Sequence, residues 1–132
     1  MLKKTIEYTD YDGNKRKEDF YFNFSEAELA EMELKVPGGM SATLNRIINS
    51  RDDAELVRIF KELILQSYGE KSPDGKRFIK SEELSKAFTQ TEAYSKLFME
   101  LASDSQAASD FVKAIIPTSI QNEVNKQALP SA

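Results

Sequence analysis

The chain has 132 residues, enough for one domain with a buried core, and 40% hydrophobic and 30% charged residues, the composition of a soluble globular protein. Its net charge of −4 argues against sequence-independent DNA binding, which needs a basic face. Without cysteine or histidine, disulfides, zinc sites built on these residues, and Ser-His-Asp or Cys-His catalysis are excluded. No apolar run approaches the roughly 20 residues that span a bilayer, and the start lacks a signal-peptide core, so we expect a cytosolic protein.

Residues 1–24 carry the pattern of a β-hairpin. Ile6 and Tyr8 fall on one face of a first strand, while Phe20, Phe22 and Phe24 occupy alternate positions in a second. Between them, the segment DYDGNK contains Asp-Gly and Gly-Asn dipeptides, both suited to a two-residue hairpin turn. A lone hairpin is marginal in water, so its aromatic face is expected to pack on the helices that follow.

Residues 25–117 are expected to form a helical domain together with the hairpin, and residues 118–132 a polar C-terminal tail. The expected fold class is therefore mainly α, an N-terminal β-hairpin packed on a bundle of five to six short helices. The strongest helix runs from Leu56 to Tyr68, where apolar residues recur at spacings of three and four, and Gly69 is expected to end it. A second apolar stripe runs from Tyr94 to Leu101.

Hydroxyl and acidic residues mark the expected helix starts. Ser25 and Glu28 form a capping box, in which each side chain bonds the other's backbone N–H. The segment VPGG, residues 36–39, is expected to end that first helix. The remaining expected caps are Ser41, Ser50 with Asp53, Ser81, Thr91, and Ser103 with Gln106, and Pro117 is expected to stop the last helix.

The segment SYGEKSPDGKRFIKS, Ser67 to Ser81, combines glycines with lysines and could be mistaken for a phosphate-binding loop. A P-loop needs two glycines four residues apart, followed by Lys and Ser or Thr. Here five residues separate Gly69 from Gly75, and Lys76 is followed by Arg77. The segment is therefore interpreted as a helix stop, a Pro-Asp-Gly turn and a helix cap in succession.

Other candidate chemistry also fails. Asp10, Asp12 and Asn14 match the first ligand positions of an EF-hand loop, but Lys15 and Tyr21 stand where the loop needs Gly and Glu. Three carboxylate pairs lie at or beside expected helix starts, where negative charge is favourable without any catalytic role: Glu26 with Glu28, Asp52 with Asp53, and Glu82 with Glu83. No catalytic, cofactor or metal site is predicted, and the protein is not expected to be an enzyme.

Residues 67–117 carry the spaced motifs YG-x-K-S-x-DG-x-x-F-x-K, AF-x-x-T-x-AY, L-x-MEL and F-x-x-x-IIP. This stretch resembles the tail assembly chaperones of long-tailed, siphovirus-type bacteriophages. Asn23-Phe24-Ser25 before an acidic helix, and the PGG stop, also fit. The family is mostly helical, so the N-terminal hairpin is a departure from it.

The resemblance implies a non-enzymatic role in tail morphogenesis. Such chaperones bind the tape measure protein and tail-tube subunits, and many are made in a short and a longer, frameshifted form. They act in the host cell cytoplasm and are absent from the mature virion. Self-association into a coat around the client is a further expectation, while nucleic acid and membranes are not expected as partners.

The client surface is expected between the two helices with the richest apolar faces, since an amphipathic client helix would dock in a groove. Its predicted residues are Leu56, Phe60, Leu63, Ile64, Tyr68, Tyr94, Leu97, Phe98 and Leu101.

Two alternatives remain open. One is a virion accessory protein of the neck, connector or baseplate, which would be present in purified virions. The other is a small phage inhibitor of a host or defence protein, which clustering of acidic residues on one face would favour.

Overall fold

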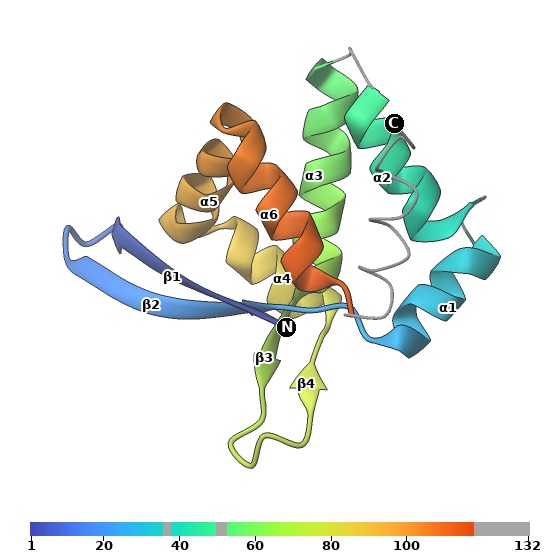
Figure 1. Ribbon diagram of the computed structural model, residues 1–132. Coiled ribbons are helices and arrows are strands. Elements are labelled where there is room, and N and C mark those ends of the chain that lie inside the picture. The colour runs from blue at the N-terminus through green and yellow to red at the C-terminus, as the bar shows by residue number, and fades with distance from the viewer. Residues whose placement is uncertain (36–37, 50–52, 118–132) are drawn as a thin grey trace.

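The computed structural model describes residues 1–35, 38–49 and 53–117, and the tail expected over residues 118–132 lies outside them. The described part holds six helices and four strands (Figure 1). Along the chain, two strands followed by three helices occur twice. In chain order they are β1 (Leu2–Thr9), β2 (Lys15–Phe22), α1 (Glu26–Lys35), α2 (Gly39–Asn49), α3 (Asp53–Ser67), β3 (Tyr68–Lys71), β4 (Phe78–Ile79), α4 (Glu82–Thr89), α5 (Glu92–Ser103) and α6 (Ser105–Ile115). The expected mainly α fold with an N-terminal hairpin is confirmed.

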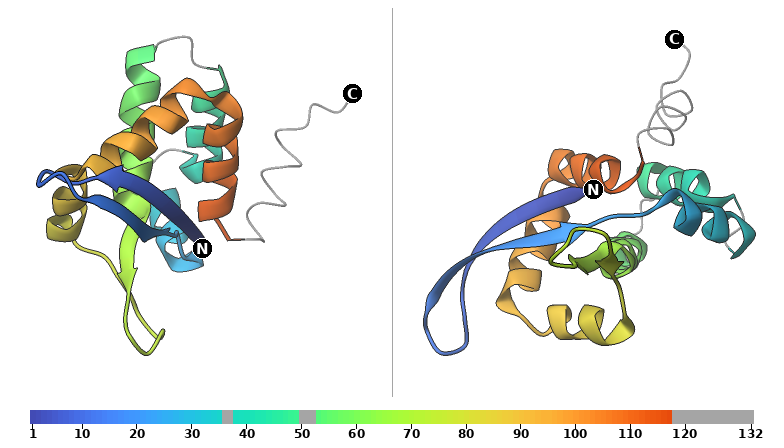
Figure 2. Two further views of the ribbon diagram at one scale, coloured as in Figure 1. Left: turned by 90° about the vertical axis from the view of Figure 1, so that its left-hand side faces the viewer. Right: turned by 90° about the horizontal axis from the view of Figure 1, so that it is seen from below.

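The helices are arranged around α3. In Figure 1, α5 and α6 lie on one side of α3, above the long hairpin of β1 and β2, while α1 and α2 lie on the other. Helix α4 contacts both α3 and α5, and β1 contacts α5 and α6. Strands β3 and β4 project away from the helices at the foot of α3, as the left view of Figure 2 also shows.

The first hairpin pairs in register from Leu2 opposite Phe22 to Thr9 opposite Lys15. Its turn is longer than the expected two residues, because the Asp10 side chain organises it. The Asp10 Oδ1 atom accepts hydrogen bonds from the backbone N–H groups of Asp12 and Asn14 at 3.0 and 2.9 Å. Its Oδ2 atom accepts one from Arg16 Nε at 2.6 Å, and these bonds lower the pKa of Asp10. Both oxygens are thus occupied within the turn.

The segment from Ser67 to Ser81 differs from its expected form, because it contains a second hairpin. Helix α3 ends at Ser67, and the chain continues directly into β3, which pairs with β4. Strand β3 also pairs with β2 at Tyr21–Gly69 and Phe22–Tyr68. The result is one antiparallel sheet of four strands in the order β1-β2-β3-β4, where the sequence predicted only the two strands of the N-terminal hairpin.

The predicted Pro-Asp-Gly turn is confirmed at the tip of this second hairpin. Gly75 has a φ of +75°, which a side chain would disfavour. The Asp74 Oδ1 atom accepts hydrogen bonds from Ser72 Oγ at 2.6 Å and from the Lys76 backbone N–H at 3.0 Å. Gly69, by contrast, is not the predicted helix stop, because it lies inside β3.

Most of the expected helix starts are confirmed. Ser25 Oγ accepts from Glu28 N at 3.1 Å, while Glu28 Oε1 accepts from Ser25 N at 2.9 Å, which completes the capping box. Ser81 and Thr91 accept hydrogen bonds from Leu84 N and Tyr94 N in the same way.

Two helix starts were predicted wrongly. Helix α6 is capped by Asp104, whose carboxylate accepts from Gln106 N and Ala107 N, while the predicted cap Ser103 is still the last residue of α5. Helix α2 begins at Gly39, two residues before the predicted cap Ser41. The predicted cap at Ser50, with Val36 and Pro37 of the first helix stop, lies outside the described residues.

A single apolar core joins the sheet to the helices. Phe22 is fully buried at its centre, where its ring contacts those of Tyr68, Phe88 and Phe111 at centroid distances of 5.8, 5.9 and 5.3 Å. The chain after β2 is also tied to the helices by backbone bonds, from Asn23 N to Ser67 O and from Phe24 N to Ile115 O, both 2.8 Å. The hairpin is therefore part of the core.

Candidate partner-binding surface

The nine residues predicted to bind a client lie in two different environments. Five are buried in the core with exposed fractions of 8% or less, and they hold the fold together: Leu63, Ile64, Tyr68, Leu97 and Leu101. The other four, Leu56, Phe60, Tyr94 and Phe98, are half-buried, so part of each side chain can be reached from solvent. Tyr68 lies in β3 and not in the helix that was expected to carry it.

Half-buried aromatic side chains form a continuous row between the first hairpin and α5. We call Tyr8, Phe20, Phe88, Tyr94 and Phe98 the aromatic row. Successive ring centroids are separated by 6.4, 5.2, 5.6 and 6.0 Å. Within the row only Phe88 is buried, and its ring also stacks on that of Tyr68, with centroids 4.3 Å apart. Aromatic pairs at such distances attract one another beyond their burial.

The phenols of the row are held in the neutral form. The Tyr8 hydroxyl donates a hydrogen bond to Glu18 Oε1, and this bond, with burial and the Glu18 charge, raises the pKa of Tyr8. Burial alone raises the pKa of Tyr94. The row therefore presents uncharged aromatic surface at neutral pH, which suits an apolar partner.

The sequence placed residues of this row on the hairpin and on a helix, but it did not predict that they contact one another. Tyr8 and Phe20 were assigned to the hairpin face, and Tyr94 and Phe98 to a helix stripe. The signals in the sequence were apolar residues at every second position, typical of a strand, and at spacings of three and four, typical of a helix. The two sets meet through Phe88 of α4, whose ring contacts both Phe20 and Tyr94.

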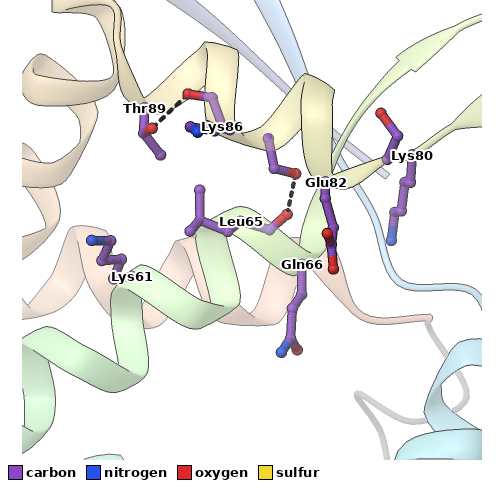
Figure 3. A pocket seen from close by; sticks show the side chains of 9 residues that line it. Lys61, Leu65, Gln66, Lys80, Glu82, Lys86 and Thr89 are labelled. Atoms are coloured by element: carbon purple, nitrogen blue, oxygen red, sulfur yellow. Dashed lines mark hydrogen bonds between the residues drawn. The ribbon is translucent and has the colours of Figure 1, made fainter.

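Two surface depressions are formed by other residues, and no member of the aromatic row lines either of them. The larger, of about 500 Å³, lies between α3 and α4, and we call it the α3–α4 pocket. Its lining residues are Lys61, Leu65, Gln66, Lys80, Ser81, Glu82, Ser85, Lys86 and Thr89 (Figure 3). The smaller, of about 290 Å³, lies between β1 and α5, where Lys4 and Glu100 form an ion pair at 2.9 Å.

The α3–α4 pocket is lined by polar and charged residues, with Leu65 as its one apolar residue. Ser85 Oγ donates to the Leu65 carbonyl at 2.9 Å, which joins the two helices beneath it (Figure 3). Lys80 is neutralised at its edge, because its ammonium group donates to Glu28 Oε2 and to the Asn23 carbonyl, both at 2.6 Å. Among the described residues, no group of three or more acidic, histidine or cysteine side chains could hold a metal ion.

A family model described as phage tail assembly chaperone matches residues 1–132, the whole chain. The chain belongs to this family. Comparisons with curated proteins and with solved structures gave no match. The match includes residues 1–24, the segment that contains the N-terminal hairpin.

Membership in this family makes the chain a bacteriophage tail assembly chaperone, which is a non-catalytic role. The chaperone has no helix, within the ranges that the structure describes, with the length and apolar character needed to cross a membrane.

Proposed function

We propose that this chaperone binds the tape measure protein and tail-tube subunits during tail assembly in the host cytoplasm, and leaves the tail before the virion is complete. The observation that supports the proposal is the family match over the whole chain. A tape measure protein must be long, and its apolar helical segments need cover until the tube forms around them.

We place the client contact on the accessible members of the predicted set, Leu56, Phe60, Tyr94 and Phe98, with the rest of the aromatic row as its extension. Tyr94 and Phe98 are successive members of one helix face with ring centroids 6.0 Å apart, so one client side chain can contact both. Half-buried aromatic rings make effective anchors because they offer large apolar area with little side-chain entropy to lose. The client would be an amphipathic helix.

The test is co-expression of the tape measure protein with the chaperone, followed by pull-down and titration of the purified proteins. We expect Phe98→Ser to weaken binding about tenfold or more, since interface aromatics often contribute 2 kcal/mol and 1.4 kcal/mol is tenfold. Phe60→Ser, in the same assay, measures how much α3 contributes to client binding. Met99→Ser is the matched control, because Met99 is 59% exposed on the same helix and lies outside the row.

Circular dichroism establishes that each variant is folded. Unchanged affinity in folded Phe98→Ser and Phe60→Ser variants would show that the client binds elsewhere. Recovery of a host protein alone, without any tail protein, would contradict the proposed clients. Mass spectrometry of purified virions tests the last step: the chaperone should be absent, whereas a virion accessory protein would appear at fixed copy number.

A further inference from the structure

Strand β1 has a free edge. The four strands lie in the order β1-β2-β3-β4, so within the described part of the chain β1 pairs with β2 on one side and with no strand on the other. It is also long, since all eight of its residues, from Leu2 to Thr9, pair with β2. The free edge of a long strand presents a row of unpaired backbone N–H and C=O groups, which can pair with another strand.

Hydrogen bonds on both sides of β2 show which backbone groups of β1 lie on this edge. The Asp10 N–H donates to the Asn14 carbonyl at 2.9 Å, and on the other side of β2 the Asn23 N–H donates to the Ser67 carbonyl at 2.8 Å. Bonded pairs alternate with non-bonded pairs in an antiparallel ladder, so the even-numbered residues of β1 bond β2. Among the described residues, no other segment bonds the backbone of the odd-numbered ones. The N–H and C=O groups on the free edge therefore belong to these residues: Lys3, Thr5, Glu7 and Thr9.

The smaller surface depression lies on this edge. Its lining includes four successive residues of β1, Lys4 to Glu7, whereas a pocket on one face of a strand would be lined by alternate residues. Lys96, Leu97 and Glu100 of α5 form its other wall. A space of about 290 Å³ therefore lies beside the free backbone groups, and we call it the β1–α5 groove.

We propose that the β1–α5 groove binds an extended segment of another protein, which pairs with the free edge of β1 as a fifth strand. The backbone pattern selects this occupant. The free groups belong to alternate residues, about 6.8 Å apart along the strand, and another extended chain matches that spacing. A helix does not, because its own hydrogen bonds use its backbone groups. The groove is separate from the aromatic row, so the proposal does not depend on the client contact proposed there.

The lining of the groove also indicates which side chains the bound segment would carry. It contains two lysines and two glutamates, so its formal charge is zero: Lys4, Glu7, Lys96 and Glu100. Lys4 and Glu100 form an ion pair at 2.9 Å, and Glu7 lies 3.8 Å from Lys17 on β2. A charged side chain on the segment would compete with these pairs. Small uncharged residues that favour strands, such as threonine and valine, suit the groove better.

A second copy of the chain does not fit this edge. Helix α5 packs mainly on β1 and not on β2. Antiparallel pairing of two β1 strands at the groove would place the strands about 4.8 Å apart, with both α5 helices on the same face of the sheet. Packed helices need about 8–10 Å between their axes, so the two helices would clash. A single extended segment brings no helix with it.

The experiment is NMR of the purified full-length chain, titrated with a synthetic peptide as long as β1. Threonine and valine alternate in this peptide, and a lysine beyond each end keeps it soluble. We expect saturating peptide to slow hydrogen exchange of the Thr5 and Glu7 amides at least about tenfold, because these N–H groups gain a hydrogen bond. The Ile6 amide already bonds β2, so its exchange should change less. The control is the same peptide with alternate residues N-methylated, which cannot pair.

Thr5→Pro tests the edge itself. Proline removes the Thr5 N–H, which points away from β2, and proline is tolerated in strands at such edge positions. The variant should bind the peptide about tenfold more weakly or worse, because it loses a backbone donor and its ring occupies the edge. Thr5→Val is the matched control: it also loses the hydroxyl bond to Asp19, but it keeps the N–H group. Circular dichroism establishes that both variants are folded.

Unchanged exchange of the Thr5 and Glu7 amides at millimolar peptide overturns the proposal. So does equal binding of the N-methylated peptide, or binding by folded Thr5→Pro that is as tight as that by Thr5→Val. Protection of these amides that rises with chaperone concentration, without peptide, would show that a second copy occupies the edge and would overturn the choice of occupant. No tail protein is present, so these outcomes are independent of whether the chaperone binds the tape measure protein.

Discussion

Gly69 allows β3 and β4 to approach more closely than any side chain would permit. A Cβ atom added there would lie 2.7 Å from the Phe78 ring and 2.8 Å from the Ile79 carbonyl oxygen. Real Cβ contacts are longer, so the strands would have to separate or the Phe78 ring would have to move. The sequence assigned this glycine to a helix end, but close packing, and not a positive φ, explains it.

We expect Gly69→Ala to destabilise the chaperone by about 1–3 kcal/mol, the range typical of overpacking a well-packed site. Urea unfolding followed by circular dichroism measures the effect. Gly75→Asn is the control, because Gly75 has open space around it and asparagine tolerates its positive φ. Equally small losses of stability in both variants would show that β4 can move to accommodate a side chain at position 69.

Asp10 shows how one side chain can decide the shape of a turn. Its carboxylate bonds two backbone N–H groups and Arg16, so the loop is closed from within. The sequence offered two readings of this aspartate, as a calcium ligand or as a turn residue. The turn reading is correct, because the oxygens that a cation would need are already used by the turn.

Among the elements, a helix start could be predicted from the sequence wherever only one residue near it was able to act as the N-cap. Ser25 with Glu28, Ser81 and Thr91 are such cases. Between α5 and α6, Ser103 and Asp104 compete for the same role. The aspartate caps α6 through two backbone N–H groups, while Ser103 Oγ donates to the Met99 carbonyl within α5.

We expect Asp104→Ala to cost about 0.5–2 kcal/mol of stability, the usual effect of removing an N-cap. Ser103→Ala should cost distinctly less, since its hydroxyl bonds a carbonyl that α5 can satisfy at its exposed end. Thermal unfolding of both variants beside the wild type makes the comparison. A larger loss of stability in Ser103→Ala than in Asp104→Ala would show that Ser103, and not Asp104, is the N-cap of α6.

At the scale of the whole molecule, Phe22 decides whether hairpin and helices unfold together. It belongs to the first hairpin, yet it contacts rings from β3, α4 and α6. One residue of the predicted hairpin segment, residues 1–24, therefore links three other elements of the core.

We expect Phe22→Ala to destabilise the chaperone by about 3–5 kcal/mol, as removal of a buried phenylalanine does. The wild type should unfold in one transition, with tyrosine fluorescence and circular dichroism giving the same midpoint. Separate midpoints for the two signals would instead mean that the hairpin unfolds as an independent unit. Phe98→Ala, at a half-buried position, should cost less.

Apolar spacing could not tell which of the nine residues predicted to bind a client are accessible to solvent. Apolar spacing correctly selected faces of α3 and α5 that pack, but spacing has the same form whether a face contacts the core or a partner. Leu63, Ile64 and Leu97 prove to be core. The sequence could not separate them from Phe60 and Phe98, because burial depends on elements distant in the chain.

The sequence by itself determined the helix caps at Ser25, Ser81 and Thr91, the turn at Gly75, and the resemblance to tail assembly chaperones. Caps and turns depend on hydrogen bonds and backbone angles within a few residues, so short patterns suffice to predict them. Only the tertiary structure decided that β2 pairs with β3, that Phe22 lies at the centre of the core, and that β1 lies at the edge of the sheet. These outcomes depend on contacts between segments far apart in the chain, whose relative stability no local pattern contains.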